Sequence, residues 1–81
     1  MQKSTFSAEY AVFLRLLREA RTSAGVTQEE LAERIADTQS FVSKCERGER
    51  RLDFVEVRAL CEAIGISFAK FAGDFDRALR G

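Results

Sequence analysis

The stretch TQEELAERIADTQSFVSKCERGER, residues 27–50, carries two helix start signals that are separated by only a short segment. Thr27 can cap a first helix, and Glu30, three residues later, completes a capping box with it. Thr38 can cap a second helix, which we expect over residues 39–47. Little chain remains between the end of the first helix and this second cap. The stretch therefore predicts two short helices joined by a tight turn.

Three further helices are expected around this pair, one before it and two after it. Each begins at a residue that can cap a helix, and two of them end at a glycine that can adopt a left-handed conformation. The apolar residues between these signals recur every three to four positions, as on one face of a helix. The signals are, in chain order, Ser7, Gly25, Asp53, Gly65 and Ser67. The sequence therefore predicts an all-α fold of five helices.

The length of the chain favours one compact domain. It has 81 residues, of which 46% are hydrophobic and 32% are charged. We expect a single domain over residues 1–81, with residues 1–6 as an N-terminal arm and residues 67–81 as a C-terminal helix. A domain of this size buries a modest share of its surface on folding, so self-association is expected on stability grounds.

The charges balance over the chain but not locally. Thirteen basic and 13 acidic residues give a formal net charge of zero, so the chain as a whole has no electrostatic attraction to nucleic acid. Four basic and two acidic residues between positions 44 and 51 leave a local charge of four minus two, or +2. These are Lys44, Glu46, Arg47, Glu49, Arg50 and Arg51. Any contact with a polyanion must come from such local groups.

Several classes of protein have no support in the sequence. No stretch has the form of a signal peptide or the length of a membrane span, so we expect a cytoplasmic protein without membrane contact. Cys45 and Cys61, with no histidine, predict no metal site and are expected to be small buried hydrophobes, with a redox switch as the alternative. No cofactor, small-molecule ligand or enzymatic activity is expected, because the chain has no glycine-rich phosphate loop and no paired carboxylates.

The helix expected over residues 39–47 has two distinct faces. Val42 and Cys45 point inward, and Phe41 is expected to pack beneath the helix, with contact to a thymine methyl group as the alternative. The opposite arc carries side chains that can form hydrogen bonds with base edges or phosphates, namely Gln39, Ser40, Ser43, Lys44 and Arg47. A tight helix pair with such a face is the signature of a DNA-binding helix-turn-helix.

Residues 27–50 closely resemble the helix-turn-helix of phage Cro and lambda-type repressors and their bacterial relatives. The resemblance extends back over the first expected helix and forward through LCEAIGIS at residues 60–67. It implies a compact, lambda-repressor-like five-helix domain whose second and third helices form the helix-turn-helix. It also implies a sequence-specific regulator of transcription, a repressor that binds a palindromic operator in double-stranded DNA as a homodimer.

The resemblance also implies roles for single residues. Gln39 and Ser40 match the leading base-reading positions, and Ser43 and Lys44 match those one turn further along. Gln28 matches the residue that opens the preceding helix beside a phosphate. The residues expected to contact phosphates are Gln28, Thr38, Arg47, Arg50 and Arg51. Weaker candidates for contact with the DNA backbone are Lys3, Arg15, Arg18 and Arg21.

The turn between the two helices departs from the family pattern. Ala36 stands where many family members have glycine. A positive φ costs an alanine about 1 kcal/mol, whereas aspartate tolerates that conformation better. We therefore expect the preceding helix to stop near residues 36–37 and Asp37 to adopt the left-handed conformation.

The last expected helix carries the apolar stripe Phe68, Phe71, Phe75 and Leu79. We expect Phe68 and Phe71 to close the core, and Phe75 and Leu79 to contact a second subunit. A second class of function remains open at this point. The same scaffold can serve as a protein-interaction module, such as the antitoxin of a toxin–antitoxin pair or a transcriptional adaptor, in which the stripe binds a different partner.

Overall fold

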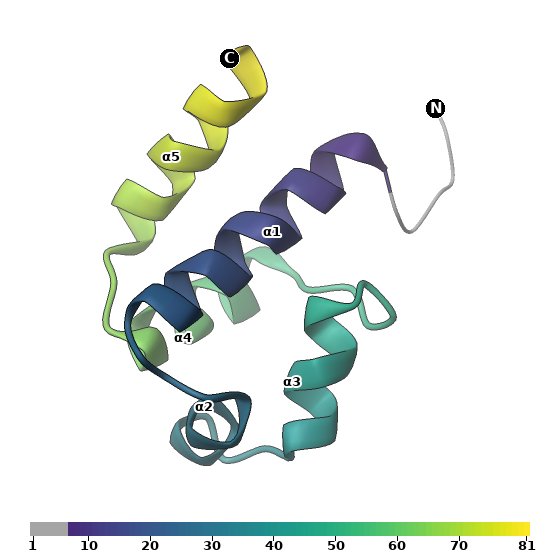
Figure 1. Ribbon diagram of the computed structural model, residues 1–81, viewed down its shortest axis with the longest axis vertical. Coiled ribbons are helices and arrows are strands. Elements are labelled where there is room, and N and C mark those ends of the chain that lie inside the picture. The colour runs from purple at the N-terminus through teal and green to yellow at the C-terminus, as the bar shows by residue number, and fades with distance from the viewer. Residues whose placement is uncertain (1–6) are drawn as a thin grey trace.

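The computed structural model describes residues 7–81, which form five α-helices joined by turns (Figure 1). The helices are α1 (Ala8–Ser23), α2 (Gln28–Arg34), α3 (Gln39–Glu46), α4 (Phe54–Ile64) and α5 (Phe68–Arg80). The all-α, five-helix prediction is confirmed. The expected N-terminal arm, residues 1–6, and with it Lys3, lies outside the described residues. None of the five helices is long and apolar enough to cross a membrane.

Each helix begins where its capping residue places it. In all five, the side chain before the first turn accepts a hydrogen bond from the backbone N–H three residues later, which satisfies a donor that the helix itself cannot. Thr27 and Glu30 form a full capping box, with bonds of 3.0 and 2.9 Å. Asp53 and Glu56 form a second one, with bonds of 2.7 and 2.9 Å. The five caps are Ser7, Thr27, Thr38, Asp53 and Ser67.

The core lies between the five helices and takes residues from each of them. Helix α1 packs on α3 and on α5, which lie to either side of it in Figure 1, while α2 packs on α3 and α4. Cys45 and Cys61 are free and buried in this core, as expected of small hydrophobes. The core residues are Leu17, Val26, Leu31, Ala32, Val42, Cys45, Leu52, Val57, Leu60, Cys61, Ile64 and Phe71. The core that holds α3 in place therefore includes residues from all five helices.

The apolar stripe of α5 is divided along the helix. Phe71 is buried and Phe68 is half-buried against the core, so their expected role in closing it is confirmed. Phe75 is half-buried, with its ring edge-on to Phe13 at a centroid distance of 6.3 Å. Leu79 is 39% exposed. The stripe thus runs from the core out to the surface of the molecule.

The turn between α2 and α3 corrects one expectation. Ala36, and not Asp37, adopts the left-handed conformation, with φ of 58°. The reason is that α2 ends at Arg34, earlier than expected, which makes Ala36 the first residue beyond the C-cap. Its N–H donates to Glu33 O at 3.2 Å, and the N–H of Asp37 donates to Ala32 O at 2.9 Å. This is the Schellman pattern, in which the residue at the position of Ala36 must be left-handed.

Replacing Ala36 with glycine is expected to stabilise the protein by about 0.5–1 kcal/mol, because glycine adopts this conformation without the steric penalty of a Cβ atom. The free energy of unfolding, measured by urea denaturation, tests this. Ala59→Gly, at an exposed position inside α4, is the matched control and should destabilise by about 1 kcal/mol. A loss of stability in both variants would contradict the strain at Ala36.

Candidate nucleic-acid interface

Helix α3 presents a polar face to solvent and an apolar face to the core. Gln39, Ser40 and Lys44 are exposed and Ser43 is half-buried. Val42 and Cys45 are buried on the opposite side, and Phe41 packs half-buried against the core, as expected. The side chain of Lys44 has no hydrogen-bonding or ion-pair partner among residues 7–81. The exposed side of α3 therefore carries polar groups with free hydrogen-bonding capacity.

A buried ion pair connects the end of α3 to α1, and sequence reasoning missed it. Arg21 Nε donates to Glu46 Oε2 at 2.6 Å, and Arg21 Nη2 donates to Glu46 Oε1 at 3.0 Å. The third contact of the guanidinium is a bond from Nη1 to Val26 O at 2.9 Å. Arg21 is only 8% exposed and Glu46 only 6%. The bidentate geometry compensates the desolvation of both charges.

This pair corrects two interpretations of the sequence. Arg21 was expected as a candidate for contact with the DNA backbone, but its three donor groups are used inside the protein. Glu46 was counted in the local charge of +2, but its carboxylate lies in the interior. The local charge that remains accessible between positions 44 and 51 is therefore more positive than +2. A signal for the pair existed in the sequence, since Glu46 follows directly on the inward-facing Cys45.

The buried carboxylate also orients two glutamines. A carboxylate only accepts hydrogen bonds, so Gln28 must turn its NH₂ group toward Glu46, and Gln28 Nε2 donates to Glu46 Oε1 at 2.9 Å. Gln28 Oε1 then faces α3 and accepts a bond of 2.8 Å from Gln39 Nε2. The amide of Gln39, at the start of α3, is thus held in one orientation by a chain of bonds that begins at Arg21.

The arginines that follow α3 are engaged with carboxylates. Arg47 donates from Nε to Glu49 Oε2 at 2.8 Å and also contacts Ser43 Oγ. Arg50 donates to both carboxylate oxygens of Glu56, at 2.9 and 2.8 Å. Hydrogen bonds from these arginines lower the pKa of Glu49 and that of Glu56, while both arginine pKa values are raised. Both carboxylates are therefore charged at neutral pH.

Two aromatic rings pack against the arginines of the loop between α3 and α4. The Arg50 guanidinium lies over the Phe41 ring, 5.2 Å from its centroid, and that of Arg51 lies over the Tyr10 ring at 4.4 Å. The hydroxyl of Tyr10 accepts a hydrogen bond from the backbone N–H of Leu52 at 3.1 Å. The start of α1 therefore fixes the position of the loop between α3 and α4.

The remaining predicted contact residues lie at both ends of α3. Thr38 caps the helix, and its Oγ1 accepts the N–H of Phe41 at 3.0 Å. At the other end, Arg15 and Arg18 of α1 line a hollow together with Arg47. The structure thus places Arg15 and Arg18 beside Arg47 and joins Gln28 to Gln39, whereas Arg21 is buried and Arg18 Nε lies 3.9 Å from Glu46 Oε1.

An exposed apolar surface lies next to this loop. Phe54 is 74% exposed and Val55 is 73% exposed at the start of α4, which sequence reasoning did not single out. The ring of Phe54 stacks edge-on against Phe68, with a centroid distance of 5.0 Å. Phe54 also lines a hollow that it shares with Phe13 and Phe75. The apolar stripe of α5 therefore continues across to the start of α4.

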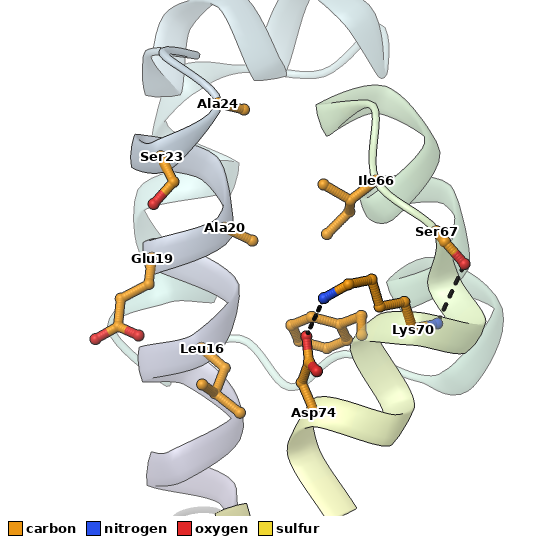
Figure 2. A pocket seen from close by; sticks show the side chains of 10 residues that line it. Leu16, Glu19, Ala20, Ser23, Ala24, Ile66, Ser67, Lys70 and Asp74 are labelled. Carbon is orange, nitrogen blue, oxygen red and sulfur yellow. Dashed lines mark hydrogen bonds and ion pairs between the residues drawn. The ribbon is translucent and has the colours of Figure 1, made fainter.

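A third hollow, a groove, lies between α1 and α5 (Figure 2). Leu16, Ala20 and Ala24 line it on the α1 side, while Ile66 and Lys70 extend toward α1 from the other side. An ion pair of 3.2 Å joins Lys70 to Asp74 within it. None of the residues that line this groove belongs to α3 or to the arginine loop. It therefore lies apart from α3 and the arginine loop, although Glu19 also lines the hollow formed by Arg15, Arg18 and Arg47.

Neither cysteine has the surroundings of a reactive thiol. Burial raises the pKa of the Cys45 thiol, and it raises that of Cys61 to about 11. Both side chains therefore remain protonated at neutral pH and lack the thiolate that oxidation and metal binding require. Among residues 7–81, no group of three histidine, cysteine or acidic side chains is arranged to hold a metal ion.

Comparison with known proteins gives consistent matches. Residues 9–71 match the sequence family described as a helix-turn-helix domain. An XRE-family like protein from Pseudomonas syringae pv. tomato str. DC3000 has a TM-score of 0.84 and 45% sequence identity, over 88% of this chain and 87% of that chain. The clp gene regulator ClgR from C. glutamicum has a TM-score of 0.76 and 26% identity, over 90% of this chain and 95% of that one. No match was found among curated proteins.

Replacing Glu46 with alanine is expected to destabilise the protein by about 3–5 kcal/mol, because Arg21 is left as a buried charge without a partner. Urea denaturation followed by circular dichroism measures the change. Glu19→Ala is the matched control, since it removes a carboxylate that pairs with Arg15 on the surface at 3.4 Å, and it should leave stability almost unchanged. Equal effects of the two substitutions would refute the structural role of the buried pair.

Proposed function

The chain belongs to the helix-turn-helix family of transcriptional regulators, which includes the XRE-family proteins, and from this premise we propose that it is a repressor that binds a palindromic operator as a homodimer. The observation that carries the proposal is the exposed face of α3, where an oriented glutamine stands beside Ser40 and Lys44, whose side chains have no partner among residues 7–81. Helix α3 enters the major groove, and the residues at its two ends contact the backbone on either side.

Gln39 reads an adenine. One N–H of its amide is bonded to Gln28, which leaves the second N–H and the carbonyl oxygen for a base. In the major groove adenine presents an acceptor at N7 and a donor at N6, and a glutamine amide matches both at once. Because Gln28 already holds the amide in one orientation, less conformational entropy is lost when the base is bound.

The other base-reading residues are Ser40, Ser43 and Lys44. Lys44 is exposed and unpartnered within the described part of the chain, and it can donate to guanine or to a phosphate. Ser40 and Ser43 can both donate and accept, so their hydroxyls fit several bases. We therefore expect the strongest base preference at the pair contacted by Gln39.

Phosphate contacts at both ends of α3 hold the helix in the groove. The proposed residues are Gln28, Thr38, Arg47, Arg50 and Arg51, with Arg15 and Arg18 as weaker contacts. Gln28 and Thr38 lie near the start of α3, and the three arginines follow its end. Such contacts position the protein on the duplex without selecting its sequence.

A second copy of the chain binds the apolar surface formed by Phe54, Phe75 and Leu79. Two of these side chains are exposed, and Phe54 and Phe75 line one hollow together with Arg51 of the loop. A two-fold axis at this surface places the arginine loops of both copies side by side, facing one stretch of DNA. Two recognition helices one helical turn apart then read the two halves of a palindrome.

Selection from a random pool of duplexes at about 150 mM salt tests the proposed function. We expect enrichment of an inverted repeat whose half-sites are about 10 base pairs apart. Weak, salt-sensitive binding without an enriched motif would contradict the regulator and favour the protein-interaction module on the same scaffold. Repression itself is tested by a reporter gene under the selected operator.

Gln39→Ala is expected to reduce discrimination at one base pair by about 1–3 kcal/mol, since the bidentate contact is lost. Fluorescence anisotropy with the selected operator and its single-base variants measures this. Arg51→Ala should instead weaken binding to all of these duplexes by a similar factor. If Gln39→Ala left the preference at every position unchanged, Gln39 would not be a base-reading residue.

Phe54→Ser combined with Leu79→Ser is expected to convert the dimer to a monomer and to weaken operator binding. The reason is that the two substitutions remove the exposed apolar side chains of the proposed interface. Sedimentation velocity gives the mass, and a thermal melt recorded in parallel shows whether the fold is retained. A dimer of unchanged stability in this variant would place the interface elsewhere.

A further inference from the structure

Two of the proposed phosphate-binding arginines are occupied by carboxylates of the same chain. Arg47 and Glu49 form a two-bond contact, with distances of 2.8 and 3.3 Å. Arg50 and Glu56 form another, with distances of 2.9 and 2.8 Å. A carboxylate and a phosphate can each accept two parallel hydrogen bonds from one arginine. Each guanidinium is thus already bonded as it would be on DNA.

These two pairs differ from the other exposed ion pairs of the protein. Arg58 and Glu62 of α4 lie four residues apart on one helix, as neighbouring charges on a helix surface commonly do. Glu49 and Glu56 instead reach their arginines across the loop between α3 and α4, at separations of two and six residues. They meet Arg47 and Arg50 because of how the loop is folded, at the place where the phosphates are expected.

We infer that Glu49 and Glu56 compete with DNA phosphates for Arg47 and Arg50, and thereby set the overall affinity of the protein for DNA. The inference rests on the proposed function, because it concerns the same phosphate contacts. When a duplex binds, each arginine exchanges a carboxylate for a phosphate. It therefore contributes less binding free energy than an arginine without a carboxylate partner would. The exchange does not depend on base sequence, so it lowers affinity for operator and non-operator DNA alike.

Such competition has a use for a DNA-binding protein. Non-specific binding depends almost wholly on phosphate contacts, and a genome offers a vast excess of non-specific sites. Weaker arginine contacts release the protein from those sites, while the base contacts of α3 still distinguish the operator. The net charge of zero also weakens non-specific binding to DNA, because the chain as a whole is not attracted to the phosphates.

The test compares Glu49→Ala with Glu62→Ala. Both substitutions remove one exposed carboxylate from an arginine and change the net charge equally, but Glu62 lies outside the proposed interface. Dissociation constants are measured for the selected operator and for a scrambled duplex. We expect Glu49→Ala to tighten binding to both duplexes by about two- to five-fold, the range that an exposed ion pair allows, and Glu62→Ala to have little effect.

A double-mutant cycle with Arg47→Ala separates competition from a general charge effect. The gain from Glu49→Ala should disappear when Arg47 is absent. A gain that persists without Arg47, or that Glu62→Ala reproduces, would overturn the inference. If the unmodified protein bound no duplex at all, the proposed function would fail, and the inference with it.

Glu56→Gln provides a second, independent variant. Glu56 also accepts the backbone N–H of Asp53 in the capping box, and glutamine keeps an oxygen acceptor for that bond while losing the charge. A melt recorded in parallel establishes that α4 is intact. We expect Glu56→Gln to tighten binding to the operator and to the scrambled duplex by the same factor. Unchanged or weaker binding by the folded variant would show that Glu56 does not compete for Arg50.

Discussion

The buried ion pair between Arg21 and Glu46 is the interaction on which the arrangement of the interface depends. It joins α1 to the end of α3, two segments that are 25 positions apart in the sequence. The same arginine binds the carbonyl of Val26 and so holds the turn that leads into α2. Charges buried to this degree are stable only when every partner is present. One side chain therefore fixes three helices relative to one another, where apolar packing alone would tolerate small displacements.

The same pair gives direction to the polar groups around it. A carboxylate has no hydrogen to donate, so the orientation of Gln28, and through it that of Gln39, follows from the charge state of Glu46. The interior of the protein thus determines which atoms the exposed end of α3 offers to a ligand. The arginine loop is organised by other means, through the rings of Phe41 and Tyr10 and through carboxylates that the chain itself supplies.

Features that depend on neighbouring residues could be predicted from the sequence. The starts of all five helices follow from capping residues three positions from their partners, and the outward face of α3 follows from its spacing. The position of Glu46 next to the inward-facing Cys45 was a signal that it faces the core, but nothing local to either residue identifies Arg21, 25 positions away, as its partner. Ala36 was misjudged because the left-handed position depends on where the last turn of α2 closes. The exposure of Phe54 depends on the path of α5. The roles of single residues toward DNA stay predictions.

The side chains on the outer face of α3 differ in how strongly the fold constrains them. The side chains of Ser40 and Lys44 are exposed and form no hydrogen bond or ion pair among residues 7–81, so a mutation there alters what the helix displays and leaves the interior intact. Gln39 is the last member of a bonded chain that reaches a buried charge, so its replacement also disturbs the protein behind it. Substitutions at positions 40 and 44 therefore change the outer surface of α3 alone, whereas a substitution at position 39 also breaks a bond that leads to the interior. The outer face of α3 can thus be altered at those two positions without cost to the fold that presents it.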